Sequence, residues 1–198
     1  MINQDEFLAS PMVSVILATY NRANMLSRAI EGVLCQTFMD FEFIIVDDGS
    51  KDNTAAVVGQ YSDPRIIYKP VEHGERARAR NIGIQISRGK YISFLDSDDW
   101  YLPEKLAEQV KVLEENPEAG MTLGGWQIVN ENGQVIHEDH PWENLSPHLT
   151  AEDWLFRGTA NPNTILFRRD WFIRVGGFDT DLITVEDTDL WIRLTLAG

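Results

Sequence analysis

Residues 13–50 read VSVILATYNRANMLSRAIEGVLCQTFMDFEFIIVDDGS, with two apolar runs on either side of a segment of mixed character. The apolar runs VSVILA (13–18) and FEFIIV (41–46) have the length and composition of buried strands. Between them, residues 26–34 place apolar side chains at helical spacing. Two neighbouring strands joined through a helix form a βαβ unit, whose strands are parallel. The stretch therefore predicts a mainly parallel sheet with helices on both faces.

The alternation of strands and helices continues as far as Asn116. Two more strands and three more helices are expected, at RIIYK (65–69) and YISFL (91–95) and at residues 54–61, 79–86 and 102–113. This regular order of elements is typical of the α/β class, in which a Rossmann-like sheet lies between layers of helices.

The pattern beyond Asn116 is more irregular. The expected elements are a hairpin within 121–139, a strand at TILFRR (164–169), a turn at GGFD (176–179) and a helix at VEDTDLWIRL (185–194). No repeat or low-complexity linker divides the chain. We therefore expect a single domain over residues 1–198, with a regular half (1–116) and an irregular half (117–198).

Composition narrows the class of protein. The chain has 198 residues, 43% of them hydrophobic, and a formal net charge of −14, which favours a globular domain and argues against nucleic acid as a partner. No apolar run approaches the roughly 18 residues of a membrane span, and the N-terminal MINQDEFLAS is not a signal peptide. The single cysteine, Cys35, cannot form an internal disulfide and is expected to be buried, so the chain is interpreted as cytoplasmic.

Positive charge gathers in one segment of this acidic chain. Between Arg65 and Lys90, seven Lys or Arg residues stand against two Glu residues. Such a segment can bind a small anion, although a solvated helix face explains it about as well on composition alone.

Polar side chains follow three of the four predicted strands, at the edge where parallel sheets bind ligands. They are Thr19, Tyr20 and Asn21 after the first strand, Asp47 and Asp48 after the second, and Asp96, Ser97, Asp98 and Asp99 after the fourth. Turn formation explains any single cluster. Three clusters at one edge favour a ligand site, because packed carboxylates become favourable when a divalent cation lies among them. The sequence thus predicts Mg²⁺ or Mn²⁺ that bridges to a diphosphate.

At this point the ordered motifs resemble a known family. The segments VSVILATYNR, IIVDDGSKDNT, ARARNIGI, GKYISFLDSDD, VGGFD and VEDTDLWIRL look like those of the family 2 glycosyltransferases of the GT-A fold. The resemblance implies an inverting transfer, as in polysaccharide biosynthesis, from a nucleotide-diphosphate donor, expected to be a UDP-sugar. The acceptor would be a hydroxyl of a saccharide, a lipid-linked molecule or a protein.

The resemblance also implies roles for the residues at the strand ends. The implied nucleotide-binding residues are Thr19, Tyr20, Asn21, Asp48, Arg76, Arg80 and Asp96. Tyr20 would lie against the base, and Asp48 would accept a hydrogen bond from uracil N3–H. Asp96 would lie by the ribose, and Asp98 would bind the metal ion of the DxD motif.

Simpler interpretations exist for several of these residues. Tyr20 is also typical of a core, and Asp48 of a turn. Arg76 and Arg80 lie four residues apart, hence on one helix face, where they could instead pair with a surface acid. Asp99 is expected to do no more than cap the next helix.

A carboxylate must accept the proton of the acceptor hydroxyl in an inverting transfer. In the family, the second residue of an ED pair near the end of the domain does so, and that residue maps to Asp187. A capping box from Thr184, with Asp187 at its third helical position, is the structural alternative. Glu186 and Asp189 are weaker candidates for the base. His73, His137, His140 and His148 lack metal-ligand spacing and are interpreted as surface residues.

Other functions remain open at this level. A nucleotidyltransferase would carry a glycine-rich phosphate loop after the first strand, where ATYNR has no glycine. A phosphoacceptor domain would carry its acidic pair after the first strand, whereas IIVDDGS places it after the second. A sugar-nucleotide-binding domain without activity is the third alternative. Family members usually continue past LTLAG, so we expect a C-terminal truncation, with attachment to a membrane only through the acceptor or the missing part.

Overall fold

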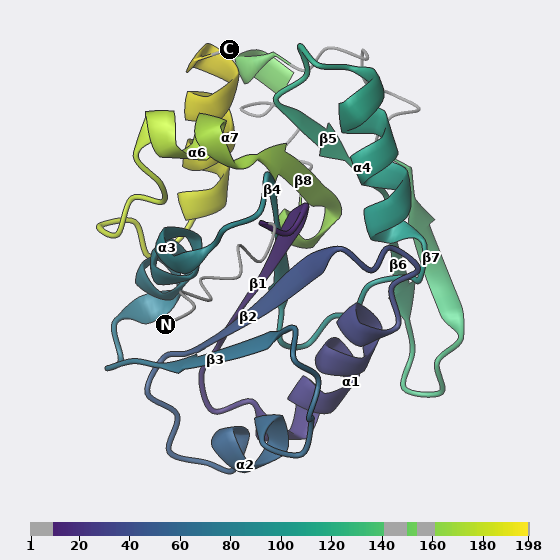
Figure 1. Ribbon diagram of the computed structural model, residues 1–198, viewed down its shortest axis with the longest axis vertical. Coiled ribbons are helices and arrows are strands. Elements are labelled where there is room, and N and C mark those ends of the chain that lie inside the picture. The colour runs from purple at the N-terminus through teal and green to yellow at the C-terminus, as the bar shows by residue number, and fades with distance from the viewer. Residues whose placement is uncertain (1–9, 141–149, 154–160, 198) are drawn as a thin grey trace, which may run out of the picture.

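A computed structural model describes residues 10–140, 150–153 and 161–197 of the chain. Its centre is a six-stranded sheet with the strand order β3-β2-β1-β4-β8-β5 (Figure 1). The six strands are β1 (Val13–Thr19), β2 (Phe41–Asp47), β3 (Ile66–Pro70), β4 (Tyr91–Asp96), β5 (Met121–Leu123) and β8 (Ile165–Arg168). The mixed α/β class is confirmed, as are the four strands predicted before Asn116.

The first four strands form the parallel part of the sheet. β1 pairs in parallel with β2 and with β4, and β2 pairs in parallel with β3. The apolar runs of β1, β2 and β4 are almost completely buried, as expected for strands covered on both faces. β8 then pairs antiparallel with β4 and β5, so the sheet is mainly but not wholly parallel.

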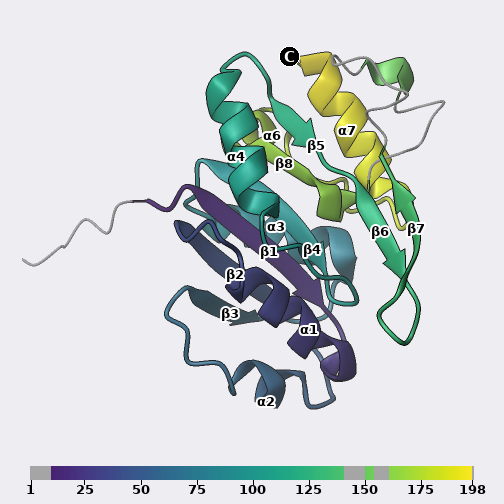
Figure 2. The same cartoon turned by 90° about the vertical axis from the view of Figure 1, so that its right-hand side faces the viewer.

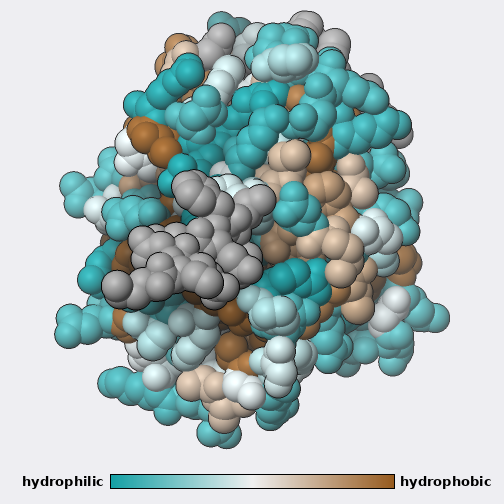
Figure 3. All heavy atoms as spheres, viewed as in Figure 1, coloured by the Kyte–Doolittle hydropathy of each residue, from teal (hydrophilic) through white to brown (hydrophobic). Residues whose placement is uncertain are grey.

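Helices cover both faces of the sheet. The described helices of seven or more residues are α1 (Ala23–Leu34), α3 (Glu75–Ile86), α4 (Lys105–Glu115), α6 (Arg169–Val175) and α7 (Glu186–Ala197). The short α2 (Thr54–Val58), α1 and α4 pack on one face, and α3, α6 and α7 on the other (Figures 1 and 2). Side chains alternate along each strand, so β1, β2, β4 and β8 contribute residues to both hydrophobic layers. The face shown in Figure 3 carries many hydrophilic side chains, consistent with the acidic composition.

The irregular half departs from the predicted hairpin. Met121–Leu123 joins the main sheet as β5, and only β6 (Trp126–Val129) and β7 (Val135–Asp139) form the two-stranded hairpin. Gly124 and Gly125 separate the two parts. Helix α6 was not predicted, because its seven residues are too few to show a helical period. A short 3₁₀ turn, η2 (Pro162–Thr164), precedes β8.

Two local predictions are wrong. Cys35 is exposed, because it follows the last residue of α1 and does not lie on the buried face of that helix. Helix α4 begins at Lys105 and not near Leu102, so Asp99 lies too far from it to be its cap. Within the described ranges, no helix has the length and apolar character to cross a bilayer.

Candidate active site

A pocket of about 330 Å³ lies at the carboxyl ends of β1, β2 and β4, and we call it the strand-edge pocket. Six of the predicted site residues line it: Thr19, Tyr20, Asp48, Arg76, Asp96 and Asp98. Asn21, Arg80 and Asp187 are not among the described residues of its lining. The sheet topology explains the gathering, because parallel strands bring their carboxyl ends to one edge.

One end of the pocket is built from an aromatic ring and a buried carboxylate. Asp48 is 3% exposed, and its Oδ1 accepts a hydrogen bond from Gly74 N at 2.9 Å. Its Oδ2 lies 2.7 Å from His73 Nδ1. The ring of His73 stacks on Tyr20, with 4.1 Å between the ring centroids. The three side chains Tyr20, His73 and Asp48 therefore form one connected wall.

His73 contributes to the strand-edge pocket, although its sequence context predicts no role for it. It was interpreted as a surface residue without a role, yet it lines the strand-edge pocket and contacts two predicted site residues. The available signal was its position in the turn EHG (72–74), just after β3, which is the strand that pairs with β2 before Asp48.

Neighbouring residues hold this end of the sheet in place. Asp48 N donates to Thr19 O at 2.9 Å, which ties the end of β2 to the end of β1. Asp47 accepts a hydrogen bond from Ser50 N at 2.9 Å through Oδ1. Asn21, at a φ of 51°, accepts from Lys51 N at 2.8 Å through Oδ1. Asn21 thus organises the loop after β2 and does not line the pocket.

Residues 96–99, which we call the acidic turn, begin at the last residue of β4, and their three carboxylates have different partners. Asp96 accepts from Arg80 Nη2 at 2.6 Å, while Asp98 lies 3.8 Å from Arg22 Nη1 with about half of its side chain exposed. Asp99 points to the other side of the turn and accepts from Asn163 Nδ2. Burial, with the charges of Asp96 and Asp98, raises the pKa of Asp99 to about 6.

Arg76 and Arg80 meet one buried acid. Glu186 Oε1 lies 2.7 Å from Arg76 Nε and 3.3 Å from Arg80 Nη1. The two arginines do lie on one face of α3, and the ion pair foreseen as an alternative is present, although Glu186 is 2% exposed and not a surface acid. Because Arg80 also pairs with Asp96, an ion-pair network links the strand-edge pocket to the first residue of α7.

Asp187 is the second residue of α7. The capping-box alternative is wrong, because the helix begins at Glu186 and the third helical position is therefore Thr188. Asp187 Oδ1 accepts from Thr188 N at 2.7 Å. Asp189 is paired with Arg193 at 2.6 Å within the same helix. Of the three acids considered for the base, Asp187 is thus the one without an Arg or Lys partner in the described chain.

The residues of the strand-edge pocket can bind a divalent cation only if water and a bound ligand complete its coordination shell. In the described part of the chain, no group of three or more His, Cys, Asp or Glu side chains is arranged to hold a metal ion. Mg²⁺ normally takes one or two carboxylates and completes its shell with water and phosphate oxygens. Asp98 lines the pocket and is half exposed, so it can supply such a carboxylate.

Comparison with known proteins identifies the family. The model of glycosyl transferase family 2 matches residues 14–176, a range that includes every predicted site residue except Asp187. An uncharacterised glycosyltransferase of Rickettsia bellii is 34% identical over 200 residues, which cover 98% of this chain and 29% of the relative. The chain thus spans less than a third of that relative.

Solved structures show the same fold. Staphylococcus aureus TarS 1-349, crystallised with UDP-GlcNAc, superposes with a TM-score of 0.78 at 24% identity, over 93% of this chain and 53% of the TarS 1-349 chain. The mannosyltransferase PcManGT of Pyrobaculum calidifontis, in complex with GDP-Man and Mn²⁺, gives 0.71 at 22% identity, over 96% and 54%. The sheet and its flanking helices therefore have the GT-A architecture, and the chain belongs to glycosyl transferase family 2.

Proposed function

We propose that this protein transfers a sugar, with inversion, from a UDP-sugar to an acceptor hydroxyl. The observation that carries the proposal is the strand-edge pocket, which combines an aromatic ring and a buried carboxylate at one end with the acidic turn at the other. The nucleotide sugars bound by TarS and PcManGT support a donor of this class. The proposed domain spans residues 1–198, with the donor held by residues 1–116 and the acceptor by residues 117–198.

The wall formed by Tyr20, His73 and Asp48 would recognise the base of the nucleotide. Tyr20 is 40% exposed and offers its aromatic surface to the base. Asp48 accepts the uracil N3–H, and its contacts with His73 and Gly74 N hold the carboxylate in one orientation. Thr19 and Asn21 shape the loops around the base, and Asp96 lies by the ribose.

The end of the pocket proposed to hold the diphosphate contains both acidic and basic side chains. Asp98 would hold Mn²⁺ or Mg²⁺, which supplies positive charge against the charge that grows on the leaving diphosphate. Arg22 and Arg76 line the same pocket and add donors for phosphate oxygens. The Mn²⁺ in the PcManGT complex supports a metal at such a site.

Asp187 would be the general base. The acceptor oxygen bonds to the anomeric carbon as the bond to the diphosphate oxygen breaks, and the hydroxyl proton passes to Asp187. Asp187 follows Glu186, which is held by Arg76 and Arg80. The first turn of α7 is therefore anchored to the same helix that supplies Arg76 to the pocket.

A thermal-shift panel tests the proposed donor. UDP-glucose, UDP-GlcNAc, GDP-mannose and UTP are compared, each with and without Mn²⁺. A ligand at 100 times its dissociation constant adds roughly 2.7 kcal/mol to the free energy of unfolding. We expect the UDP-sugars with Mn²⁺ to raise the melting temperature most. A preference for UTP would favour nucleotidyl transfer, and no shift with any nucleotide would contradict the proposal.

A further inference from the structure

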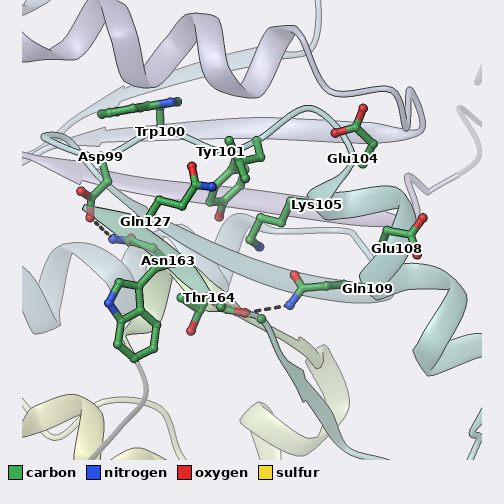
Figure 4. Close-up of a pocket in the computed structure, with 14 residues that line it drawn as sticks. Asp99, Trp100, Tyr101, Glu104, Lys105, Glu108, Gln109, Gln127, Asn163 and Thr164 are labelled. Carbon is green, nitrogen blue, oxygen red and sulfur yellow. Dashed lines mark hydrogen bonds between the residues drawn. The ribbon is translucent and has the colours of Figure 1, made fainter. Parts of the chain in front are cut away.

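A second pocket lies on the other side of the acidic turn. It also measures about 330 Å³ and is bounded by the loop after β4, the start of α4, the start of β6 and the residues before β8. We call it the α4 pocket. Figure 4 shows Asp99 and Asn163 at one end, Glu104 and Glu108 at the other, and Lys105 and Gln109 between them.

Gln109 lines this pocket and has a buried side-chain oxygen without a hydrogen-bond partner. Its side chain is 6% exposed, and its Nε2 donates to Thr164 O at 2.7 Å, which fixes the orientation of the amide. Oε1 is buried, and no described residue donates a hydrogen bond to it. A buried carbonyl oxygen without a donor is costly. Gln109 Oε1 therefore has the chemistry to accept a hydrogen bond from a hydroxyl or amine of a ligand.

Aromatic side chains form much of the remaining wall. Trp100, Tyr101 and Trp126 all line the α4 pocket. The guanidinium of Arg28 lies 3.2 Å from the ring centroid of Trp100 and holds that indole in place. Aromatic faces pack against the C–H faces of a pyranose, while amide side chains bind its hydroxyl groups. The wall thus combines the two surfaces that an uncharged sugar ring requires.

The charges of the pocket select against an anion. Asp99, Glu104 and Glu108 line it, and Lys105 is the one Lys or Arg in its described lining. Lys105 is already engaged, because its Nζ donates to Ser93 Oγ at 2.7 Å. The strand-edge pocket, in contrast, has Arg22 and Arg76 for phosphate groups. A phosphate or a uronic acid is therefore unsuited to the α4 pocket.

The acidic turn lies between the two pockets, because Asp96 and Asp98 line the strand-edge pocket and Asp99 lines the α4 pocket. Asn163 donates through Nδ2 to Asp99, on the side of the α4 pocket, and accepts from Asp96 N at 2.7 Å through Oδ1. One side chain thus holds both ends of the acidic turn. A sugar in the α4 pocket would lie beside the diphosphate end of the strand-edge pocket.

We propose that the α4 pocket is a saccharide subsite for an uncharged pyranose, with Gln109 Oε1 accepting a hydrogen bond from a sugar hydroxyl. The inference rests on the proposed glycosyl transfer and extends it to this second pocket. The bound pyranose can come from two molecules, because it is either the sugar of the donor or a sugar of the acceptor.

The test compares two glutamine variants. Gln109→Met removes the unpartnered oxygen at nearly constant side-chain length, and Thr164 O keeps its hydrogen bond from Gly124 N at 2.8 Å. Gln85→Met, on the exposed face of α3, is the matched control. Methyl β-D-glucopyranoside, methyl N-acetyl-β-D-glucosaminide and glucuronic acid are titrated by NMR, with and without UDP and Mn²⁺.

We expect the wild-type protein and Gln85→Met to bind at least one neutral glycoside and not glucuronic acid. Gln109→Met should weaken that binding at least tenfold, or about 1.4 kcal/mol, without lowering the melting temperature. A purely structural glutamine would give the reverse, with a lower melting temperature and unchanged sugar affinity. Trp126→Ala, which removes ring surface from the pocket, should weaken the same binding even if Gln109→Met fails to fold.

A donor titration separates the two sources. If the ring is the donor's, Gln109→Met weakens UDP-glucose more than UDP; if it is the acceptor's, both nucleotides bind as before and only the free glycoside is lost. Absence of glycoside binding by the wild-type protein, together with equal UDP-glucose affinity in the wild type and Gln109→Met, would overturn the subsite. Absence of UDP binding would contradict the proposed function, while the glycoside titration without UDP still decides the subsite.

Discussion

At the scale of single residues, Asp48 shows how a strand end places a buried carboxylate in a pocket. β2 ends at Asp47, whose carboxylate closes the following turn through Ser50 N, and this leaves Asp48 to enter the strand-edge pocket. His73 and Gly74 N then hold the Asp48 carboxylate. The proposed role in reading the base depends on this fixed orientation.

Asp48→Ala should separate base recognition from phosphate recognition. The variant loses the acceptor for N3–H, so we expect UDP to bind at least about tenfold more weakly, a change of about 1.4 kcal/mol. Binding of pyrophosphate with Mn²⁺ should change little, since those contacts lie at the other end of the pocket. Calorimetric titration of both ligands checks this, and an equal loss of both would identify Asp48 as a metal ligand or a folding residue.

Asp187→Asn should show whether Asp187 acts as the general base or only as a structural residue. Loss of a general base typically lowers the rate about 10²–10⁴-fold. We expect at least about a 10²-fold lower transfer rate, with unchanged UDP-sugar affinity and melting temperature, because the base acts on the acceptor. Asp189→Asn is the control, since that residue pairs with Arg193. Normal transfer by Asp187→Asn would redirect the search to Glu186 and Asp189.

At the scale of elements, the contact between α3 and α7 depends on buried charge. Arg80 and Glu186 are each 2% exposed, and Arg80 also pairs with Asp96 at the end of β4. The pair joins three elements on one side of the sheet. Removing one partner of such a pair leaves a buried charge without compensation.

Glu186→Leu should therefore destabilise the fold. The variant leaves Arg80 buried without one of its two acids, so we expect a loss of about 3–5 kcal/mol in the free energy of unfolding. Urea denaturation checks this. Glu115→Leu, at the exposed last residue of α4, is the control and should change the value by less than about 0.5 kcal/mol. A loss below about 1 kcal/mol for Glu186→Leu would show that the pair contributes little.

The elements also show what the sequence can and cannot predict. β1, β2 and β4 were predictable because their apolar runs are long and buried on both faces. β5 was assigned to a hairpin, since three residues do not reveal which partner strand they choose. The contacts of His73 with Asp48 and of Arg80 with Glu186 join residues 25 and 106 positions apart. Such pairings depend on the tertiary fold and leave no local pattern.

At the scale of the whole molecule, Lys105 makes stability depend on pH. Burial lowers the pKa of Lys105 to about 7 from its ordinary value of 10.5. Between these two values the unfolded chain binds a proton that the folded chain has released. The free energy of unfolding therefore gains a contribution that rises with pH through this window, by at most about 1.4 kcal/mol per pH unit.

Lys105→Met should remove this pH dependence. We expect its stability relative to the wild type to be highest near pH 7 and to fall as the pH approaches 10, as measured by urea denaturation at several pH values. Lys111→Met, on the exposed face of the same helix, should run parallel to the wild type. A Lys105→Met curve that also runs parallel would mean that Lys105 titrates normally.

We propose that the strand-edge pocket binds a nucleotide diphosphate through a metal ion held by Asp98. Calorimetric titration of UDP into the wild-type protein and Asp98→Asn, in Mn²⁺ and in EDTA, tests this role of Asp98. We predict that the wild-type protein binds UDP at least about tenfold more tightly in Mn²⁺, and that Asp98→Asn loses this difference. Equal binding in EDTA would contradict the role of Asp98, and absence of UDP binding in both conditions would contradict the assignment of the pocket.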